Sequence, residues 1–264
     1  MLEQSLKNAN LNLQSSVTSS DNWAQRQADA YNNEVGTMKY YDCPKCKNKG
    51  TIAVVVDDEM LMHHCSCKPI RMSKRLLAES GINEDYTLET YVAKDEWQKK
   101  VLVAAKNFLF NPQGWFYIGG QVGGGKTHIC TGIVRGLIDI GNEARYMLWR
   151  DDSTKIKASV NYPEDYASLV EPLKTVKVLY IDDFWKTNSG EPTTADVNLA
   201  FEILNARYNR KDLITIISSE YYSNELMDVD EAVGSRIYER ASGNRHNIKR
   251  DRQRNYRLRG DELL

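Results

Sequence analysis

Eight residues near the middle of the chain combine glycines with a lysine and a threonine in a spacing that suits phosphate chemistry. The segment Gly120 to Thr127 reads GQVGGGKT and matches the pattern G-x-x-x-x-G-K-S/T at every fixed position. In such a loop, backbone N–H groups surround the phosphates, the lysine contacts the β- and γ-phosphates, and the hydroxyl binds Mg²⁺. We therefore predict that the chain binds ATP or GTP with Mg²⁺. The predicted nucleotide-binding residues are Gly120, Gln121, Val122, Gly123, Gly124, Gly125, Lys126, Thr127 and His128.

Two adjacent acidic residues follow an apolar segment further along the chain. The mostly apolar run Val176 to Ile181 leads into Asp182 and Asp183. A buried parallel strand presents the residues at its carboxyl end on the edge where α/β sheets bind ligands. We expect Asp182 to hold the Mg²⁺ shell with Thr127, and Asp183 to orient or deprotonate the attacking water. The alternative is two carboxylates that end a strand and face solvent.

Four of the five cysteines lie together in two pairs, Cys43-x-x-Cys46 and Cys65-x-Cys67. Four thiolates from two tight turns suit a closed tetrahedral Zn²⁺ site, and the eighteen residues between the pairs are long enough for a connecting hairpin. Either His63 or His64 could replace a cysteine as ligand, although four cysteines already complete the set. The alternative is four reduced cysteines on an ordinary hairpin.

Hydroxyl groups end a second apolar segment, Leu213 to Ser218. ATPases with a phosphate loop usually place a polar side chain at such a strand end, where it senses the γ-phosphate. Ser218 or Ser219 could have this role, and capping of the next turn is the alternative. Glu220 occupies a position where an asparagine is expected.

Two arginines at i and i+4 follow in the segment Gly234 to Arg240. This spacing places Arg236 and Arg240 on one face of a helix, directed away from the phosphate loop of the same chain. It suits an arginine finger that acts on a neighbouring subunit, with Arg240 as the favoured residue. The alternative is a surface pair that bonds to Glu239.

The alternation of strand-like and helix-like segments predicts an α/β fold with a parallel sheet flanked by helices. The predicted strands are Trp115 to Ile118, Ala144 to Trp149, Val176 to Ile181 and Leu213 to Ser218. The predicted domains are a polar N-terminal segment at 1–40, a small zinc-binding hairpin module at 41–70, a linker at 71–94, an ATPase core at 95–245 and a basic tail at 246–264.

Composition favours a cytoplasmic protein. No run approaches the roughly 18 apolar residues of a membrane span, and the polar start lacks the apolar segment of a signal peptide. The formal net charge of −1 conceals a concentration of positive charge near the C-terminus. The basic residues there are Arg245, Lys249, Arg250, Arg252, Arg254, Arg257 and Arg259.

Taken together, the paired cysteines, GQVGGGKTH, VLYIDDFWK, the SSE strand end and GSRIYER resemble the DnaC/DnaI-type bacterial or phage replicative helicase loaders, a branch of the AAA+ ATPases. The resemblance covers roughly residues 40 to 260. It implies an ATPase that binds the hexameric replicative DNA helicase through its N-terminal region and places it on single-stranded DNA during DNA replication. ATP binding and hydrolysis would be the switch, and subunits would assemble through the arginine-finger face.

The sequence departs from this family in two places. Many relatives carry glutamate where this chain has Asp183, and the chain ends without a full helical lid after the sheet. An arginine of the tail, Arg254 or Arg257, could then contact the nucleotide of its own subunit. The basic tail, with Tyr221, Tyr222 and Tyr256 as stacking residues, would suit single-stranded DNA, and a solvated charged face is the alternative.

Two other functions are compatible with the same motifs. An IstB-type transposition helper has a similar ATPase core, but the cysteine module in front favours the loader. An adaptor that binds ATP without hydrolysing it is the second alternative, because Asp183 and Glu220 both depart from the usual residues.

Overall fold

The computed structural model describes residues 21–187 and 190–258, and the chain divides into two compact units at Lys74 and Arg75. Part of the predicted 1–40 segment and the end of the basic tail, including Arg259, lie outside the described residues. Helix α2 (Lys68–Ser80) begins in the N-terminal unit and ends in the C-terminal unit.

The N-terminal unit consists of a helix against a two-stranded hairpin. Its elements are α1 (Asp21–Asn33), β1 (Thr51–Val56) and β2 (Glu59–His64). The strands pair antiparallel, and the tight turn between them has Asp57 and Asp58 in the left-handed region, at φ 50° and 62°.

Helix α1 is fixed to the hairpin by hydrogen bonds as well as packing. The Asn32 amide donates to the carbonyl of Ala53 at 2.8 Å and accepts from its N–H at 2.9 Å, and the Tyr31 and Thr51 hydroxyls lie 2.6 Å apart. The predicted boundary at residue 40 therefore differs from the structure, because α1 belongs to the same unit as the hairpin.

The C-terminal unit is built on one parallel five-stranded sheet. Its strands are β3 (Trp115–Gly120), β4 (Ala144–Leu148), β5 (Val178–Phe184), β6 (Ile214–Ser219) and β7 (Arg245–Ile248), in the order β4-β5-β6-β3-β7. All the pairings in this sheet are parallel. The predicted α/β class with a parallel sheet is confirmed, and so are the four strands predicted in it.

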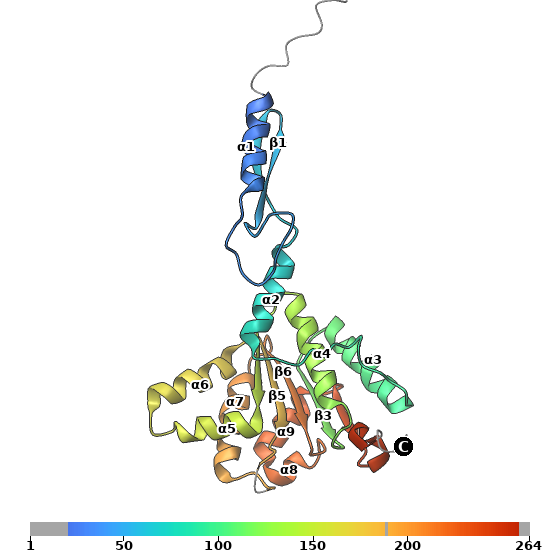
Figure 1. Ribbon diagram of the computed structural model, residues 1–264. Helices are drawn as coiled ribbons and strands as arrows, with labels where there is room; N and C mark the ends of the chain where they lie inside the picture. The colour runs from blue at the N-terminus through green and yellow to red at the C-terminus, as the bar shows by residue number, and fades with distance from the viewer. Residues whose placement is uncertain (1–20, 188–189, 259–264) are drawn as a thin grey trace, which may run out of the picture. The chain divides into compact units, whose positions relative to one another are not determined.

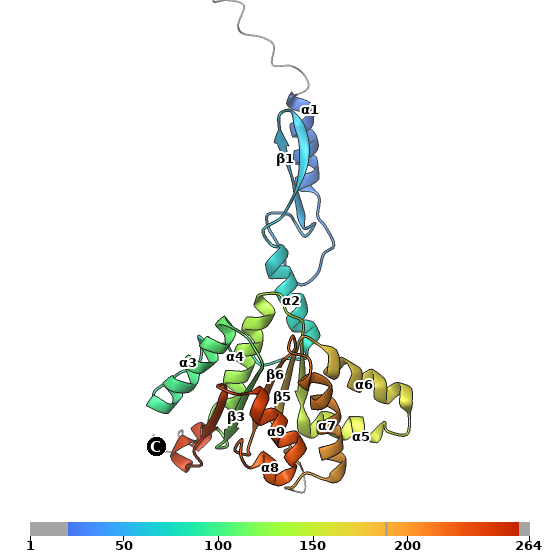
Figure 2. The same cartoon turned by 180° about the vertical axis from the view of Figure 1, so that it is seen from behind.

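Helices cover both faces of this sheet, as the opposite views in Figures 1 and 2 show. The helices of the unit are α3 (Glu96–Phe110), α4 (Lys126–Asp139), α5 (Trp149–Ala158), α6 (Pro163–Thr175), α7 (Thr194–Tyr208), α8 (Leu226–Val229) and α9 (Glu231–Arg240). None of the helices in the described ranges is both long and apolar enough to cross a membrane.

The side chains of each strand alternate between two separate cores. Phe116 and Ile118 of β3 pack with α3 and α4 on one face, whereas Trp115 and Tyr117 pack with α5 to α9 on the other. This alternation is the period of two that a strand imposes. Each face of β3 is completely buried, which accounts for its continuous apolar sequence.

Parts of two predicted segments, the linker at 71–94 and the tail at 246–264, belong to the C-terminal unit. Ile82, Leu88 and Tyr91, from the predicted linker at 71–94, are buried in the core beside α4. Strand β7, which was not predicted, extends the sheet by pairing with β3, and two short 3₁₀ turns follow it at Arg252–Arg254 and Tyr256–Leu258.

Candidate nucleotide site and cysteine centre

The glycine-rich loop connects the end of β3 to the start of α4, as the phosphate-loop pattern requires. Gly120 has φ 99° and Gly123 has φ 69°, a region that side chains with a Cβ rarely adopt. A Cβ on Gly120 would also collide with the Ile248 carbonyl oxygen, and one on Gly123 with the Asn255 side chain. The loop is thus shaped by its own torsions and by the chain that follows β7.

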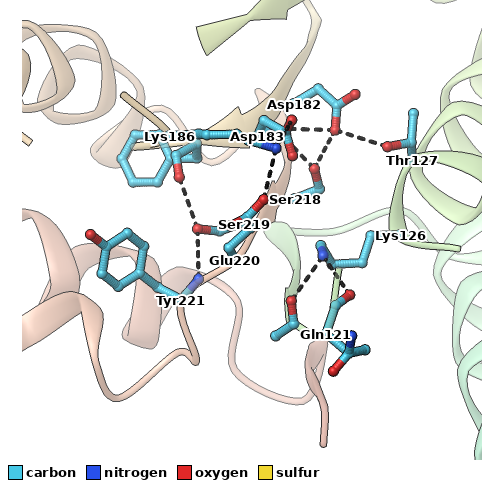
Figure 3. A network of polar contacts seen from close by, with 12 residues as sticks. Gln121, Lys126, Thr127, Asp182, Asp183, Lys186, Ser218, Ser219, Glu220 and Tyr221 are labelled. Carbon is cyan, nitrogen blue, oxygen red and sulfur yellow. Dashed lines mark hydrogen bonds and ion pairs between the residues drawn. The ribbon is translucent and has the colours of Figure 1, made fainter. Parts of the chain in front are cut away.

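Lys126 lies inside this loop at the first turn of α4. Its Nζ donates to the carbonyl oxygens of Gly120 and Gln121, each at 2.9 Å, as Figure 3 shows. Burial lowers the pKa of Lys126, while the nearby carboxylates of Asp183 and Glu220 oppose that shift. The ammonium group is therefore held at the centre of the phosphate loop.

Asp182, at the carboxyl end of β5, faces the threonine of the loop. Its carboxylate accepts hydrogen bonds from the hydroxyls of Thr127 at 3.3 Å, Tyr146 at 3.2 Å and Ser218. Burial raises the pKa of Asp182, and these hydroxyl donors counteract the rise. Oxygen donors of this kind suit Mg²⁺, so Thr127 and Asp182 together fit the predicted metal position.

Asp183 lies in an irregular turn where β5 loses its regular pairing with β6. Its φ is 51°, and its N–H donates to Ser218 Oγ and to Asp182 Oδ1, each at 3.1 Å. Its carboxylate pairs with Lys186 Nζ at 3.1 Å. The residue predicted to orient water is therefore bonded to a lysine of its own turn.

The two serines at the end of β6 fasten this turn to the sheet. Ser218 is fully buried between the backbone of Asp183 and the carboxylate of Asp182, and Ser219 Oγ donates to the Phe184 carbonyl at 2.8 Å. Glu220, the next residue, pairs with Lys186 at 2.7 Å. The hydroxyl of Ser218 thus positions the acidic pair, and its predicted sensing of the γ-phosphate stays a prediction.

A cavity of about 540 Å³ brings these elements together. It is lined by the segment before α3, by the phosphate loop, by the ends of β5 and β6, and by the chain after β7. The lining residues are Tyr86, Thr90, Tyr91, Val92, Lys94, Val122, Gly123, Gly124, Gly125, Lys126, Thr127, His128, Asp183, Lys186, Glu220, Tyr256 and Arg257. Its volume falls in the range of small-molecule sites.

Aromatic rings form one end of this cavity. Tyr86 stacks on His128 with ring centroids 4.5 Å apart, and Tyr91 meets the same imidazole edge-on at 5.2 Å. His128 Nε2 also lies 2.9 Å from the Thr87 carbonyl and 3.1 Å from the Thr90 hydroxyl. His128 was predicted as a nucleotide-binding residue, whereas Tyr86 and Tyr91 were not, because they precede the loop in a segment without a motif.

The C-terminal segment passes along the phosphate loop. The Tyr256 N–H donates to the Gly123 carbonyl at 3.0 Å, and the Asp251 N–H donates to the Gln121 side chain at 2.7 Å. Of the two arginines that could contact the nucleotide, Arg257 lines the cavity, whereas Arg254 lies over the Trp97 ring at 5.2 Å.

Tyr221 and Tyr222, two of the residues predicted to stack on bases, have partners within the chain. The Tyr222 ring lies under the Arg250 guanidinium at 4.3 Å, and the Tyr221 carbonyl accepts a hydrogen bond from Tyr117 at 2.8 Å. Arg250 also forms an ion pair with Glu225 at 2.6 Å. The predicted DNA contact stays a prediction.

The two candidate arginine fingers lie on α9, outside the residues that line the cavity. Arg236 lies over the rings of Phe201 and Tyr208, at 4.9 and 5.4 Å, and donates to Asn205 at 3.2 Å. Arg240 lies over the Trp115 ring at 5.9 Å. Arg236 thus has a packing role within the chain, and the arginine-finger role of both residues stays a prediction.

The four cysteines of the N-terminal unit form one buried cluster, Cys43, Cys46, Cys65 and Cys67. Their sulfur atoms lie within 4.8 Å of one another, and two pairs are 3.7 and 3.6 Å apart. A tetrahedral Zn²⁺ with bonds of about 2.3 Å separates its sulfur ligands by roughly 3.8 Å, so the cluster fits the ion.

The electrostatics of the cluster also suit a metal. The Gly50 N–H donates to the Cys46 sulfur at 3.3 Å. Although burial opposes ionisation, this donor and the neighbouring thiols lower the pKa of Cys46 to about 6. Among the described residues, the metal-type cluster contains cysteines alone, and His63 and His64 lie exposed on β2. The four-cysteine ligand set is the one that fits.

No family model matches the chain. In Bacillus subtilis (strain 168), the uncharacterized protein YqaM is 27% identical over 274 aligned positions, covering 83% of this chain and 86% of its own. The phage-like element PBSX protein XkdC of the same strain is 30% identical over 221 positions, covering 76% of this chain and 80% of its own.

Solved structures share the architecture of the C-terminal unit. The crystal structure of the DnaC helicase loader matches with a TM-score of 0.53 and 20% identity, over 63% of this chain and 97% of its own. AMPPCP-bound DnaA from Aquifex aeolicus matches with a TM-score of 0.54 and 20% identity, over 70% of this chain and 56% of its own. These likenesses confirm the predicted AAA+ P-loop fold.

Proposed function

The chain belongs to the family of the PBSX protein XkdC and has the AAA+ fold of the DnaC loader, and on this premise we propose that it is an ATP-dependent helicase loader. It binds a hexameric replicative DNA helicase and delivers it onto single-stranded DNA during replication. One observation carries the proposal: the phosphate loop and Asp183 line a single cavity, with Asp182 bonded to Thr127 behind it. The DnaC neighbour, of which 97% is matched, supports the specific function.

Each polar group at the cavity has a separate task in this proposal. Backbone N–H groups of the loop and the Lys126 ammonium hold the β- and γ-phosphates. Thr127 and Asp182 hold Mg²⁺, which neutralises charge on the phosphates when bound. Asp183 orients the attacking water, and ATP binding and hydrolysis switch the affinity for the helicase.

Partner contacts are assigned to the surfaces outside the cavity. The N-terminal unit, stabilised by Zn²⁺, binds the helicase, and the face of α9 with Arg236 and Arg240 contacts the neighbouring subunit. Mixing a Lys126→Ala variant with an Arg240→Ala variant tests the second assignment. Recovery of hydrolysis in the mixture supports a finger acting in trans, and no recovery opposes it.

The loader function is tested by measuring the mass of the complex that the chain forms with the cognate replicative helicase. The full chain and the helicase are combined with ATP and without it, and light scattering gives the mass of each species. We expect a complex of defined stoichiometry whose stability depends on ATP. No association with any nucleotide would contradict the proposal and favour a transposition helper of IstB type.

A second candidate, an adaptor that binds ATP without hydrolysing it, is favoured by one contact. The carboxylate of Asp183 is paired with Lys186 Nζ at 3.1 Å, so the carboxylate is already engaged where it would have to orient the attacking water. Single-turnover hydrolysis by the parent chain and by Asp183→Asn separates the two candidates. A large loss of rate in the variant supports the ATPase, whereas equal, negligible rates support the adaptor.

A further inference from the structure

A second lysine lies at the phosphate end of the cavity, and the phosphate-loop pattern does not include it. Lys186 lines the cavity together with Lys126, Asp183 and Glu220. Its Nζ lies 3.1 Å from Asp183 Oδ2 and 2.7 Å from Glu220 Oε1, so one ammonium group bridges two carboxylates from different strands. Figure 3 places these side chains next to the phosphate loop.

The turn that carries Lys186 is firmly held beneath it. Trp185 is fully buried and stacks on Phe184 with ring centroids 4.6 Å apart, and the Lys186 N–H donates to the Asp183 carbonyl at 2.9 Å. Asp183 and Trp185 have φ values of 51° and 62°, in the left-handed region that is unfavourable for residues with a Cβ. The fold thus maintains an unfavourable backbone that directs Asp183 and Lys186 to the same place.

Charge at the cavity explains what such a lysine can do. A polyphosphate entering beside Asp183 and Glu220 meets like charges, and in a partly buried site this repulsion is screened less than in water. Lys126 is already bonded to two carbonyl groups of the loop. Lys186 is one-third exposed and has three donors on a flexible stem, so it can contact a phosphate while Glu220 retains one bond.

We propose that Lys186 contacts the γ-phosphate of ATP and, in moving to it, leaves the carboxylate of Asp183. Glu220 stays bonded to the lysine both with and without the γ-phosphate. This gives a role to the acidic residue after β6, where a neutral asparagine is expected. Asp183 becomes available to orient water only when a γ-phosphate is present. The inference rests on the proposed ATPase function and deepens it, because it makes Lys186 the residue that distinguishes ATP from ADP.

The test compares the affinities of two nucleotides on the full chain. AMPPCP, a non-hydrolysable ATP analogue, and ADP are each titrated with Mg²⁺ by calorimetry into the parent chain and into Lys186→Met. We expect the parent to bind AMPPCP more tightly than ADP. In the variant, the ratio of the ADP to the AMPPCP dissociation constant should fall about tenfold, as expected for the loss of one charge-assisted contact. Affinity for ADP should change less than about threefold, which also shows that the variant is folded.

Three further variants make the result specific. Lys186→Arg should retain part of the preference. Glu220→Gln should tighten AMPPCP by a few-fold, because it removes a negative charge that faces the phosphates while its amide oxygen still accepts a hydrogen bond from Lys186. Lys155→Met is the matched control, since Lys155 also pairs with an aspartate three residues before it, at 3.2 Å, but on the exposed side of α5. It should bind both nucleotides as the parent does.

Two results would overturn the inference. One is an unchanged preference for AMPPCP in Lys186→Met, and the other is an equal loss of AMPPCP and ADP affinity, which would assign the lysine a general structural role. Failure of the parent chain to bind either nucleotide would instead contradict the proposed function. The two failures are therefore distinguishable in one set of titrations.

Discussion

Ser218 links the two acidic residues, through the side chain of Asp182 and the backbone of Asp183. Its hydroxyl donates to Asp182 and accepts the N–H of Asp183 at 3.1 Å, and it is fully buried. A hydroxyl with two buried partners cannot be removed without leaving at least one of them with fewer hydrogen bonds. At the scale of single residues, one serine therefore couples the proposed metal position at Asp182 to the proposed water-orienting position at Asp183.

Replacing Ser218 with alanine should lower the free energy of unfolding by about 1–3 kcal/mol and weaken Mg²⁺-dependent nucleotide binding several-fold. Chemical unfolding and nucleotide titrations at varied Mg²⁺ measure the two effects. Ser219→Ala is the matched control, because its hydroxyl bonds to the Phe184 carbonyl rather than to the acidic pair. Ser219→Ala should lower the free energy of unfolding but leave the Mg²⁺ dependence of nucleotide binding as in the parent. If Ser218→Ala and Ser219→Ala showed the same Mg²⁺ dependence, the coupling would be contradicted.

The residues that could be predicted from the sequence are those that belong to short motifs, where the spacing along the chain indicates the chemistry. The glycines, Lys126 and Thr127 form one continuous loop, and Asp182 follows directly from an apolar strand. Lys186, Tyr86 and Tyr91 could not be found in this way, because tertiary packing alone brings them to the cavity. Although Lys186 lies in the quoted segment VLYIDDFWK, a lysine after a strand is usually exposed, so no role was predicted for it.

At the scale of elements, strand β7 connects the basic tail to the sheet. Its sequence, RHNI, is short and polar, and only Ile248 is buried, so it lacks the apolar alternation by which strands are predicted. It forms because β3 has a free edge, and pairing places the following residues along the phosphate loop. The same dependence on tertiary contacts explains why Ile82 and Leu88 belong to the core rather than to a linker.

His246 makes the stability of this edge depend on pH. The imidazole packs against Phe116 with centroids 5.2 Å apart, and burial lowers its pKa below the usual 6.5. As the pH falls from about 7.5 to about 5.5, the unfolded chain takes up a proton before the folded chain does, so the free energy of unfolding decreases.

We expect His246→Phe to reduce this loss of stability, because phenylalanine does not titrate. Urea unfolding of the parent and the variant at the two pH values measures the difference. His63→Gln, at an exposed position on β2, is the control and should follow the parent. An identical pH dependence in His246→Phe and the parent would contradict a contribution from His246.

At the scale of the whole molecule, the two units differ in how they are stabilised. The C-terminal unit has two extensive apolar cores, whereas the N-terminal unit buries small side chains such as Ala24, Ala28 and Ala53 around its cysteine cluster. A unit with so little apolar burial usually requires a metal or disulfides to fold, and its cysteines are free thiols.

Removal of Zn²⁺ should therefore unfold one unit and spare the other. We expect the purified chain to contain one Zn²⁺, and a strong chelator to abolish the circular dichroism contribution of the N-terminal unit while leaving nucleotide affinity unchanged. Metal analysis, circular dichroism and nucleotide titration on the same sample measure these effects. Two results would contradict this division of roles. One is a chain that keeps all its structure after the metal is removed, and the other is a chain that loses nucleotide binding when the metal is removed.

The measurement that tests the account most directly is the affinity of Mg²⁺-ATP for the parent chain and for Lys126→Ala. Lys126 is the buried cation at the centre of the phosphate loop, and its loss from a charged contact costs about 3 kcal/mol, equivalent to roughly a hundredfold in affinity. We predict saturable binding of one ATP to the parent chain and a loss of about that size in the variant. No binding by the parent, or equal affinity in the two proteins, would contradict the assignment of this cavity as an ATP site.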